Sequence, residues 1–243
     1  MSSTPAASLR RIAKKLSRQL GELSFAKPVT HVYDPTDYAW KTHSAYLGLA
    51  RRGIDAVFLG MNPGPFGMAQ TGVPFGDPVF VRDWMGLRIV ASRPADEHPK
   101  RPVLGDASTR NEVSGQRLWG FARERFDDAP AFFERFFVIN YCPLCFLEES
   151  GRNRTPDKLP ATERDAVEEL CDAALLAMIR ALEPGRLIGV GAFAEQRAQR
   201  ALASLDVPIG RVLHPSPASP VANRGWAPQA AKQLAEQGIE IPA

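Results

Sequence analysis

Two amides and one imidazole follow three separate apolar runs, and these are the side chains best placed to do chemistry. Asn62 follows the run 56–59 within three residues, Asn140 directly follows 136–139, and His214 directly follows 209–213. An imidazole N–H can donate to a developing negative charge, whereas an amide can orient water but cannot titrate. Ligands bind at the carboxyl ends of strands in parallel sheets. If the runs are neighbouring strands, Asn62, Asn140 and His214 converge on one pocket.

The segment 60–77 predicts the wall of that pocket. Four glycines follow Gly60 and three prolines are mixed in, so we expect no helix or strand to run through it. It nevertheless keeps apolar side chains that a solvated loop would lack, namely Met61, Phe66, Met68, Val73 and Phe75. A long apolar loop at the end of a buried strand is commonly functional.

The elements that must position these residues alternate along the chain. Continuous apolar runs predict buried strands over 56–59, 136–139, 187–190 and 209–213. Helical periodicity predicts helices over 8–25, 116–126, 162–182 (with Thr162 as cap), 192–205 and 229–237. This alternation favours the α/β class: a three-layer α/β/α fold around a central, mostly parallel, four-stranded sheet. We expect one domain over residues 1–243 with an N-terminal helix.

Composition excludes several classes of protein. The chain has 243 residues, a formal charge of +3 and 44% hydrophobic residues, which is ordinary for a soluble globular protein. No apolar stretch approaches a membrane span, and no signal-peptide core is seen. Three cysteines are too few for a disulfide framework, which indicates a reducing interior. We therefore expect a cytoplasmic monomer, nucleoid-associated if the source is bacterial.

Two short motifs suggest cofactors without completing a site. Gly189-x-Gly191 matches the dinucleotide pattern, but His214 stands where the ribose-binding acid is expected, so close helix–sheet packing is the favoured interpretation. Cys142 and Cys145 form a C-x-x-C without the further ligands of a zinc site, and buried free thiols are favoured instead. We expect neither a metal nor a cofactor.

Three surface segments allow two interpretations each. The basic face of the first helix is most simply solvated, with a nucleic-acid contact or a transit peptide as alternatives. The basic segment 98–102 is an exposed loop or a phosphate contact, and the aromatic segment 28–50 is a cover over the core. The stiff loop 218–226 is a surface crossing or a wedge for a base stack.

Two long motifs give the chain a family resemblance. GMNPGPFGMAQTGVPFGDP at 60–78 and HPSPASPVANRGW at 214–226 resemble the signature motifs of the single-strand-selective monofunctional uracil-DNA glycosylases. HPKRPVLG at 98–105, EVSG at 112–115 and SGRNRTP at 150–156 are similar as well, so the likeness spans roughly residues 32–226. The resemblance implies a uracil-DNA glycosylase fold. It also implies excision of uracil and 5-substituted uracils, notably 5-hydroxymethyluracil, from single- and double-stranded DNA.

The resemblance also implies roles for individual residues. Asn62 would hold the attacking water, Phe75 would stack on the flipped base with the Met61 backbone beside it, Asn140 would pair with the uracil edge, and His214 would bind the carbonyl oxygen of the departing base. The DNA-contacting residues would be Pro65, Ser216, Pro217, Ala218, Ser219, Asn223 and Arg224. The vertebrate members resemble this loop but have arginine where Ala218 stands, and Ala218 cannot fill a base-sized gap.

The implied chemistry fits these residue types. Hydrolysis of an N-glycosidic bond needs a stabilised anionic leaving group, and no lysine for a lyase step is present in either motif. Gly64 has no side chain and leaves space for a 5-substituent. Related enzymes resemble one another in having a bulky residue at this position. A binding module that recognises damaged DNA without cutting it is the alternative, and a dinucleotide-dependent enzyme is a third possibility.

Overall fold

The computed structural model describes residues 3–242 and is built around a central parallel sheet. Its strands are β2 (Ala56–Gly60), β3 (Phe136–Asn140), β6 (Leu187–Val190) and β7 (Ile209–Val212), in the order β3-β2-β6-β7. All neighbouring pairs are parallel, and Gly60 lies opposite Asn140 at the carboxyl edge. The strands are fully apolar along β2 and β6 because helices cover both faces. The predicted α/β class and four-stranded parallel sheet are confirmed.

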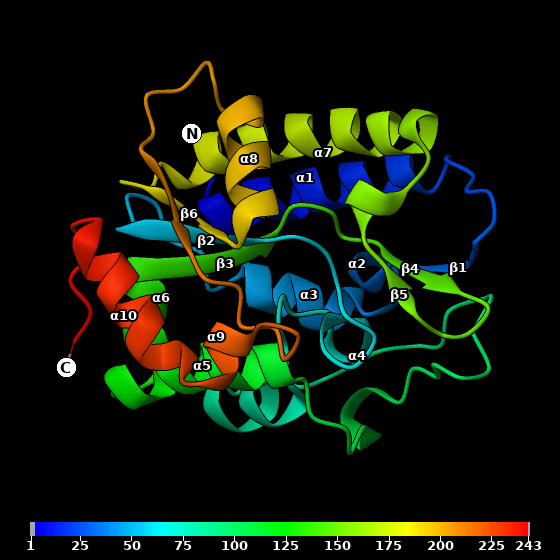
Figure 1. Cartoon of the computed structure of the whole chain (residues 1–243), viewed down its shortest axis with the longest axis horizontal. Helices are drawn as coiled ribbons and strands as arrows, with labels where there is room; N and C mark the ends of the chain where they lie inside the picture. Colours follow the sequence, from blue (N-terminus) through cyan, green and yellow to red (C-terminus); the bar gives the residue numbers. More distant parts are fainter. Residues whose placement is uncertain (1–2, 243) are drawn as a thin grey trace.

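Helices form a layer on each side of the sheet (Figure 1). The layer drawn above it holds α1 (Pro5–Leu20), α7 (Ala161–Leu182) and α8 (Ala192–Ala201). The layer below holds α3 (Trp40–Leu47), α5 (Val113–Arg125), α6 (Ala129–Arg135) and α10 (Trp226–Glu236). Buried side chains from both ends of the chain, such as Leu9 and Leu234, belong to one hydrophobic cluster.

A second, antiparallel sheet has the order β1-β4-β5. It consists of β1 (Val29–Tyr33), β4 (Cys145–Glu148) and β5 (Asn153–Arg154). Sequence patterns did not indicate it: 28–50 was expected to be an aromatic cover. The cover is partly confirmed, since Tyr33 and Tyr46 are buried and donate to backbone carbonyls of Arg101 and Val138.

Several predicted helices differ in detail. Thr162 does not cap α7, because the helix begins at Ala161 with Pro160 at the cap position. The first helix ends at Leu20, and α8 ends at Ala201, short of the expected residues. Helix α6 was not expected. Short helical segments fill the connections: α2 (Pro35–Tyr38), α4 (Met68–Thr71), α9 (Pro220–Asn223), the π-helical Phe80–Trp84, and 3-10 turns at Gly105–Ala107 and Pro156–Lys158.

The segment 60–77 contains one turn of helix, α4, but no helix or strand runs through it. Helix α4 lies between Gly67 and Gly72, and Gly72 ends it with a φ of 76°. The side chains of Met68, Ala69 and Thr71 are buried, so this part of the segment packs against the protein and is not a solvated loop.

Cys142, Cys145 and Cys171 are buried free thiols, as predicted. Within residues 3–242 no cluster of three or more His, Cys, Asp or Glu side chains is arranged to hold a metal ion. None of the helices in that range is long and apolar enough to cross a membrane.

Candidate functional site

A cavity of about 420 Å³ opens at the carboxyl edge of the central sheet. Of the residues predicted from the sequence, it is lined by Met61, Asn62, Gly64, Pro65, Phe75, Asn140, His214 and Ser216. They come from the end of β3 and from the segments that follow β2 and β7, at the carboxyl edge where ligands bind in parallel sheets. The expected convergence of Asn62, Asn140 and His214 on one pocket is therefore present.

Asn62 is oriented by its own amide nitrogen. Asn62 Nδ2 donates to the Leu144 carbonyl at 3.1 Å and approaches the Pro63 carbonyl at 3.4 Å. Both hydrogen bonds of this side chain within residues 3–242 use Nδ2, which leaves the acceptor Oδ1 for a ligand or a water. Backbone bonds fix the same segment, since Tyr141 N donates to Gly60 O and Cys142 N donates to Met61 O, both at 2.9 Å.

Asn140 is the last residue of β3 and lies opposite Gly60 of the adjacent strand β2. Its Nδ2 contacts Met68 Sδ at 3.3 Å, and its Oδ1 is buried without a hydrogen-bond partner among the described residues. A side chain at Gly60 would collide with Asn140 Oδ1 and come within 2.6 Å of the Phe75 ring. Gly60 is thus required for the amide to reach the cavity. An unpaired buried amide oxygen is unfavourable unless a ligand satisfies it.

His214 approaches the cavity from β7. Burial lowers the pKa of His214 to about 4, so the imidazole is neutral near pH 7. Its Nδ1 is buried and has no hydrogen-bond partner in the described part of the chain. The preceding residue is held rigidly: Leu213 N donates to Gln233 Oε1 at 2.8 Å, and Leu213 O accepts from Trp226 Nε1 at 2.6 Å.

Phe75 forms an aromatic wall next to His214, with ring centroids 6.0 Å apart and planes inclined by 44°. Its backbone has a φ of 55°, an uncommon value for a non-glycine residue. A Cβ at Gly115 in α5 would collide with the Phe75 carbonyl oxygen, so only glycine permits this approach. The strained backbone of Phe75 is held at the site where the ring faces the cavity.

The glycines of the dinucleotide-like motif have packing roles. A Cβ at Gly189 would lie 2.7 Å from Glu195 Cα, so Gly189 lets α8 approach β6. Gly191 has a φ of 93°, and a Cβ there would lie 3.2 Å from His214 Cβ. These contacts agree with the close-packing interpretation.

Glu112 is a cavity residue that sequence reasoning missed. Its Oε1 accepts from Ser114 N at 3.1 Å, and its Oε2 would lie 3.1 Å from a Cβ on Gly64. Burial raises the pKa of the Glu112 carboxyl, and the nearby Asp77 adds to this. Glu112 opens the EVSG segment of the resemblance, which was the available signal. The cavity also includes Gly67 and Met68 of the predicted wall 60–77, and Ser114, Asn153 and Thr155, which were not predicted.

Arg117 is the second missed residue, and it braces the loop after His214. Its guanidinium donates to Pro215 O at 3.1 Å, Ser216 O at 3.3 Å and Asn223 Oδ1 at 2.9 Å. Asn223 Nδ2 donates to Pro217 O at 2.9 Å, so one polar side-chain atom of Asn223 bonds to the loop and the other to Arg117 of α5.

The remaining predicted DNA contacts lie outside the cavity lining, on the rim beyond Ser216. Pro217, Ala218 and Arg224 are exposed, while the Ser219 hydroxyl caps α9 by accepting from Ala222 N.

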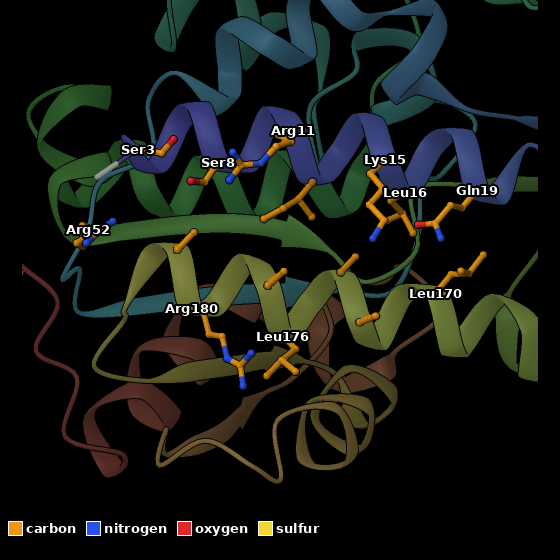
Figure 2. A pocket seen from close by; sticks show the side chains of 15 residues that line it. Ser3, Ser8, Arg11, Lys15, Leu16, Gln19, Arg52, Leu170, Leu176 and Arg180 are labelled. Atoms are coloured by element: carbon orange, nitrogen blue, oxygen red, sulfur yellow. The ribbon is translucent and has the colours of Figure 1, made fainter. Parts of the chain in front are cut away.

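A second hollow, of about 560 Å³, lies between α1 and α7 (Figure 2). Arg11, Lys15 and Arg180 line it together with apolar side chains such as Leu16 and Leu176. It contains none of the predicted site residues and none of the three strand ends. The candidate site is the cavity at the strand ends.

Known proteins resemble this chain in sequence and in fold. Residues 48–236 match the Uracil DNA glycosylase superfamily. The single-strand selective monofunctional uracil-DNA glycosylase of Rattus norvegicus is 50% identical over 228 residues, covering 93% of this chain and 82% of that protein. The corresponding protein of Bos taurus is 50% identical over 228 residues, covering 93% and 84%. The crystal structure of wild-type Pedobacter heparinus SMUG2 superposes with a TM-score of 0.65 at 18% identity, covering 93% of this chain and 97% of that one.

Proposed function

The chain belongs to the single-strand-selective monofunctional uracil-DNA glycosylase family within the uracil-DNA glycosylase superfamily, and from that premise we propose how its cavity works. It is a DNA-repair hydrolase that cleaves the N-glycosidic bond of uracil in DNA and leaves an abasic site. The observation that carries the proposal is the meeting of Asn62, Asn140 and His214 in one cavity. All of these residues come from one chain, so we expect the monomer to be active.

The uracil must leave as an anion, and His214 is placed to stabilise it. Bond cleavage puts positive charge on the sugar and negative charge on the base. The neutral imidazole of His214 donates one N–H to the carbonyl oxygen of the departing base. Its lowered pKa supports this role, because the imidazole is then neutral near pH 7 and carries one N–H as a fixed hydrogen-bond donor.

Asn62 positions the water that completes the reaction. Its Nδ2 is held by the Leu144 carbonyl, so Oδ1 accepts a hydrogen bond from water in the cavity. The amide cannot take up a proton at neutral pH, so it acts only by orienting the water. Such a weak role is sufficient when the sugar carbon is already electrophilic.

Asn140 and Phe75 select the base. Phe75 stacks on the flipped ring, and the Asn140 amide pairs with O4 and N3–H of uracil. The unpaired Oδ1 of Asn140 supports this, since N3–H supplies the missing donor. Cytosine presents the opposite group at position 4, which leaves buried polar atoms unpaired at about 1–3 kcal/mol each.

The substrate range includes 5-hydroxymethyluracil. Gly64 has no side chain to fill the space beside the base, and the Glu112 carboxyl lies across that space. A polar 5-substituent or a water fits there, whereas a bulky residue at position 64 would exclude both.

Single-stranded DNA is the better substrate in this proposal. The rim that would enter a duplex offers Ala218, whose methyl group is too small to replace an extruded base. A flipped base in single-stranded DNA leaves no partner base behind, so the small side chain is less costly there.

The experiment is a glycosylase assay on matched single- and double-stranded oligonucleotides that contain one uracil. Alkali cleavage after incubation reveals abasic sites. We expect abasic sites to form faster in the single-stranded substrate than in the double-stranded one. Tight binding without any abasic product would instead favour a module that only recognises damaged DNA.

A further inference from the structure

Two guanidinium groups, those of Arg101 and Arg110, stack on the ring of Phe66, whose chain neighbours Pro65 and Gly67 line the cavity. We name the Phe66 cation cluster as these two arginines on Phe66 together with their neighbours: Lys100, which precedes Arg101 in the chain, and Arg152, which follows Gly151, the residue packed on Arg101. The guanidinium of Arg110 lies 3.9 Å from the centre of the Phe66 ring, and that of Arg101 lies 5.2 Å from it. The proposed catalytic groups use none of these residues.

The cluster is preorganised. Arg101 Nε donates to Gly151 O at 2.7 Å, and its Nη1 donates to Lys100 O at 2.9 Å. A Cβ on Gly151 would lie 3.2 Å from Arg101 Cζ and 3.3 Å from Lys100 Cβ, so the two segments are packed together. A guanidinium held on an aromatic face loses little freedom when it binds an anion.

The charge of the cluster is not neutralised. No salt bridge joins Lys100, Arg101, Arg110 or Arg152 to a carboxylate anywhere in residues 3–242. The neighbouring Arg154 differs, because Glu148 pairs with it at 2.9 Å. Lys100, Arg110 and Arg152 are also exposed, so their charges are available to a ligand.

Chain connectivity places the cluster at the cavity mouth. Phe66 lies between the cavity residues Pro65 and Gly67. Arg110 precedes the cavity residue Glu112 by two positions, and Arg152 directly precedes Asn153, which also lines the cavity. A strand that delivers a base to this cavity therefore continues next to these cations.

We propose that the Phe66 cation cluster is a phosphate track for the DNA strand on one side of the flipped nucleotide. The inference rests on the proposed glycosylase function and deepens it. Arginine forks bind phosphate oxygens in a bidentate manner, and cationic grooves follow the backbone of single strands. Such a track holds single-stranded DNA without a duplex and without a wedge, which compensates for the small Ala218.

The test uses two single-stranded substrates that differ only in which side is extended. One carries uracil at the 5′ end with a flank of about eight nucleotides on its 3′ side. The other carries uracil at the 3′ end with a flank of the same length on its 5′ side. The variant is Arg110→Gln/Arg152→Gln, and the matched control is Arg180→Gln, a cation of the α1–α7 hollow outside the strand-end cavity.

We expect the double variant to lower kcat/KM several-fold on one of the two substrates and to change their ratio. On the substrate whose flank binds the track, the slope of log kcat/KM against log salt concentration should become shallower by about 1.4, because two phosphate contacts are lost. The control should keep the wild-type ratio and slope.

An unchanged ratio and slope in the double variant would overturn the track while uracil release continues. Equal loss on both substrates would also overturn it, since the cluster would then act on no particular flank. Failure of the glycosylase proposal gives a different result, because the wild-type protein would then release uracil from neither substrate. The proposed phosphate track would be refuted as well.

Discussion

His214 and Phe75 face one cavity with their ring centroids 6.0 Å apart and their planes inclined by 44°. A base stacked on Phe75 therefore lies within reach of a hydrogen bond from the imidazole. The two residues are 139 positions apart in the chain, and each is held by a glycine that permits close approach: Gly115 at the Phe75 carbonyl and Gly191 at His214 Cβ.

The first prediction concerns pH. Burial lowers the pKa of His214 to about 4, so the imidazole stays neutral as the pH falls from 8 towards 5. The profile of kcat/KM, which reports the free enzyme, should show no inflection near 6.5 from His214. An inflection there that disappears in His214→Asn but persists in Glu112→Gln would contradict the neutral-donor role.

The second prediction concerns the support of Phe75. Gly115→Ala places a methyl group against the Phe75 carbonyl, so we expect a loss of about 1–3 kcal/mol in the free energy of unfolding and a higher KM. Gly120→Ala is the control in the same helix, because its Cβ would meet only Phe80 Cζ at 3.7 Å. It should gain about 0.5–1 kcal/mol. Urea unfolding checks both, and similar stability of the two variants would refute the steric argument.

The third prediction concerns the 5-position of the base. Gly64→Tyr must displace the Glu112 carboxyl and fills the space beside the base. Excision of 5-hydroxymethyluracil should fall more than excision of uracil, as measured by single-turnover rates on paired oligonucleotides. If the variant and the wild type have equal rates on both substrates, Gly64 does not set the substrate range.

The fourth prediction concerns the rim loop. Ala218→Arg adds a side chain long enough to occupy the gap left by a flipped base, so excision from double-stranded DNA should increase relative to single-stranded DNA. The loop itself stays braced, because Arg117 bonds to Pro215, Ser216 and Asn223 and not to the Ala218 side chain. The ratio of the two rates measures the effect, and an unchanged ratio would exclude a wedge at this position.

The central sheet was predictable because its strands are continuous apolar runs, and the strand ends identified Asn62, Asn140 and His214. The small antiparallel sheet was not, since β5 has only two residues and β4 begins five residues after β3 ends. Thr162 fitted a cap pattern, but Pro160 occupies the cap position and the helix begins at Ala161.

Glu112 and Arg117 were missed for a different reason. Glu112 caps α5 by accepting from Ser114 N, a common role for a polar residue before a helix. Only the packing of α5 against the segment 60–77 places its carboxyl opposite Gly64. Arg117 binds a loop 98 and 99 residues away in sequence, and no local pattern predicts such a contact.

The most direct measurement is the single-turnover rate of uracil release from a single-stranded oligonucleotide by the wild type, Asn62→Ala and His214→Ala. We predict a fall of about 10²–10³ for His214→Ala, the effect of losing one donor to a developing anion, and a large fall for Asn62→Ala. The control is His31→Ala, an imidazole on β1 beside Asp96, which should keep the wild-type rate. Wild-type rates in folded Asn62→Ala and His214→Ala would contradict the account.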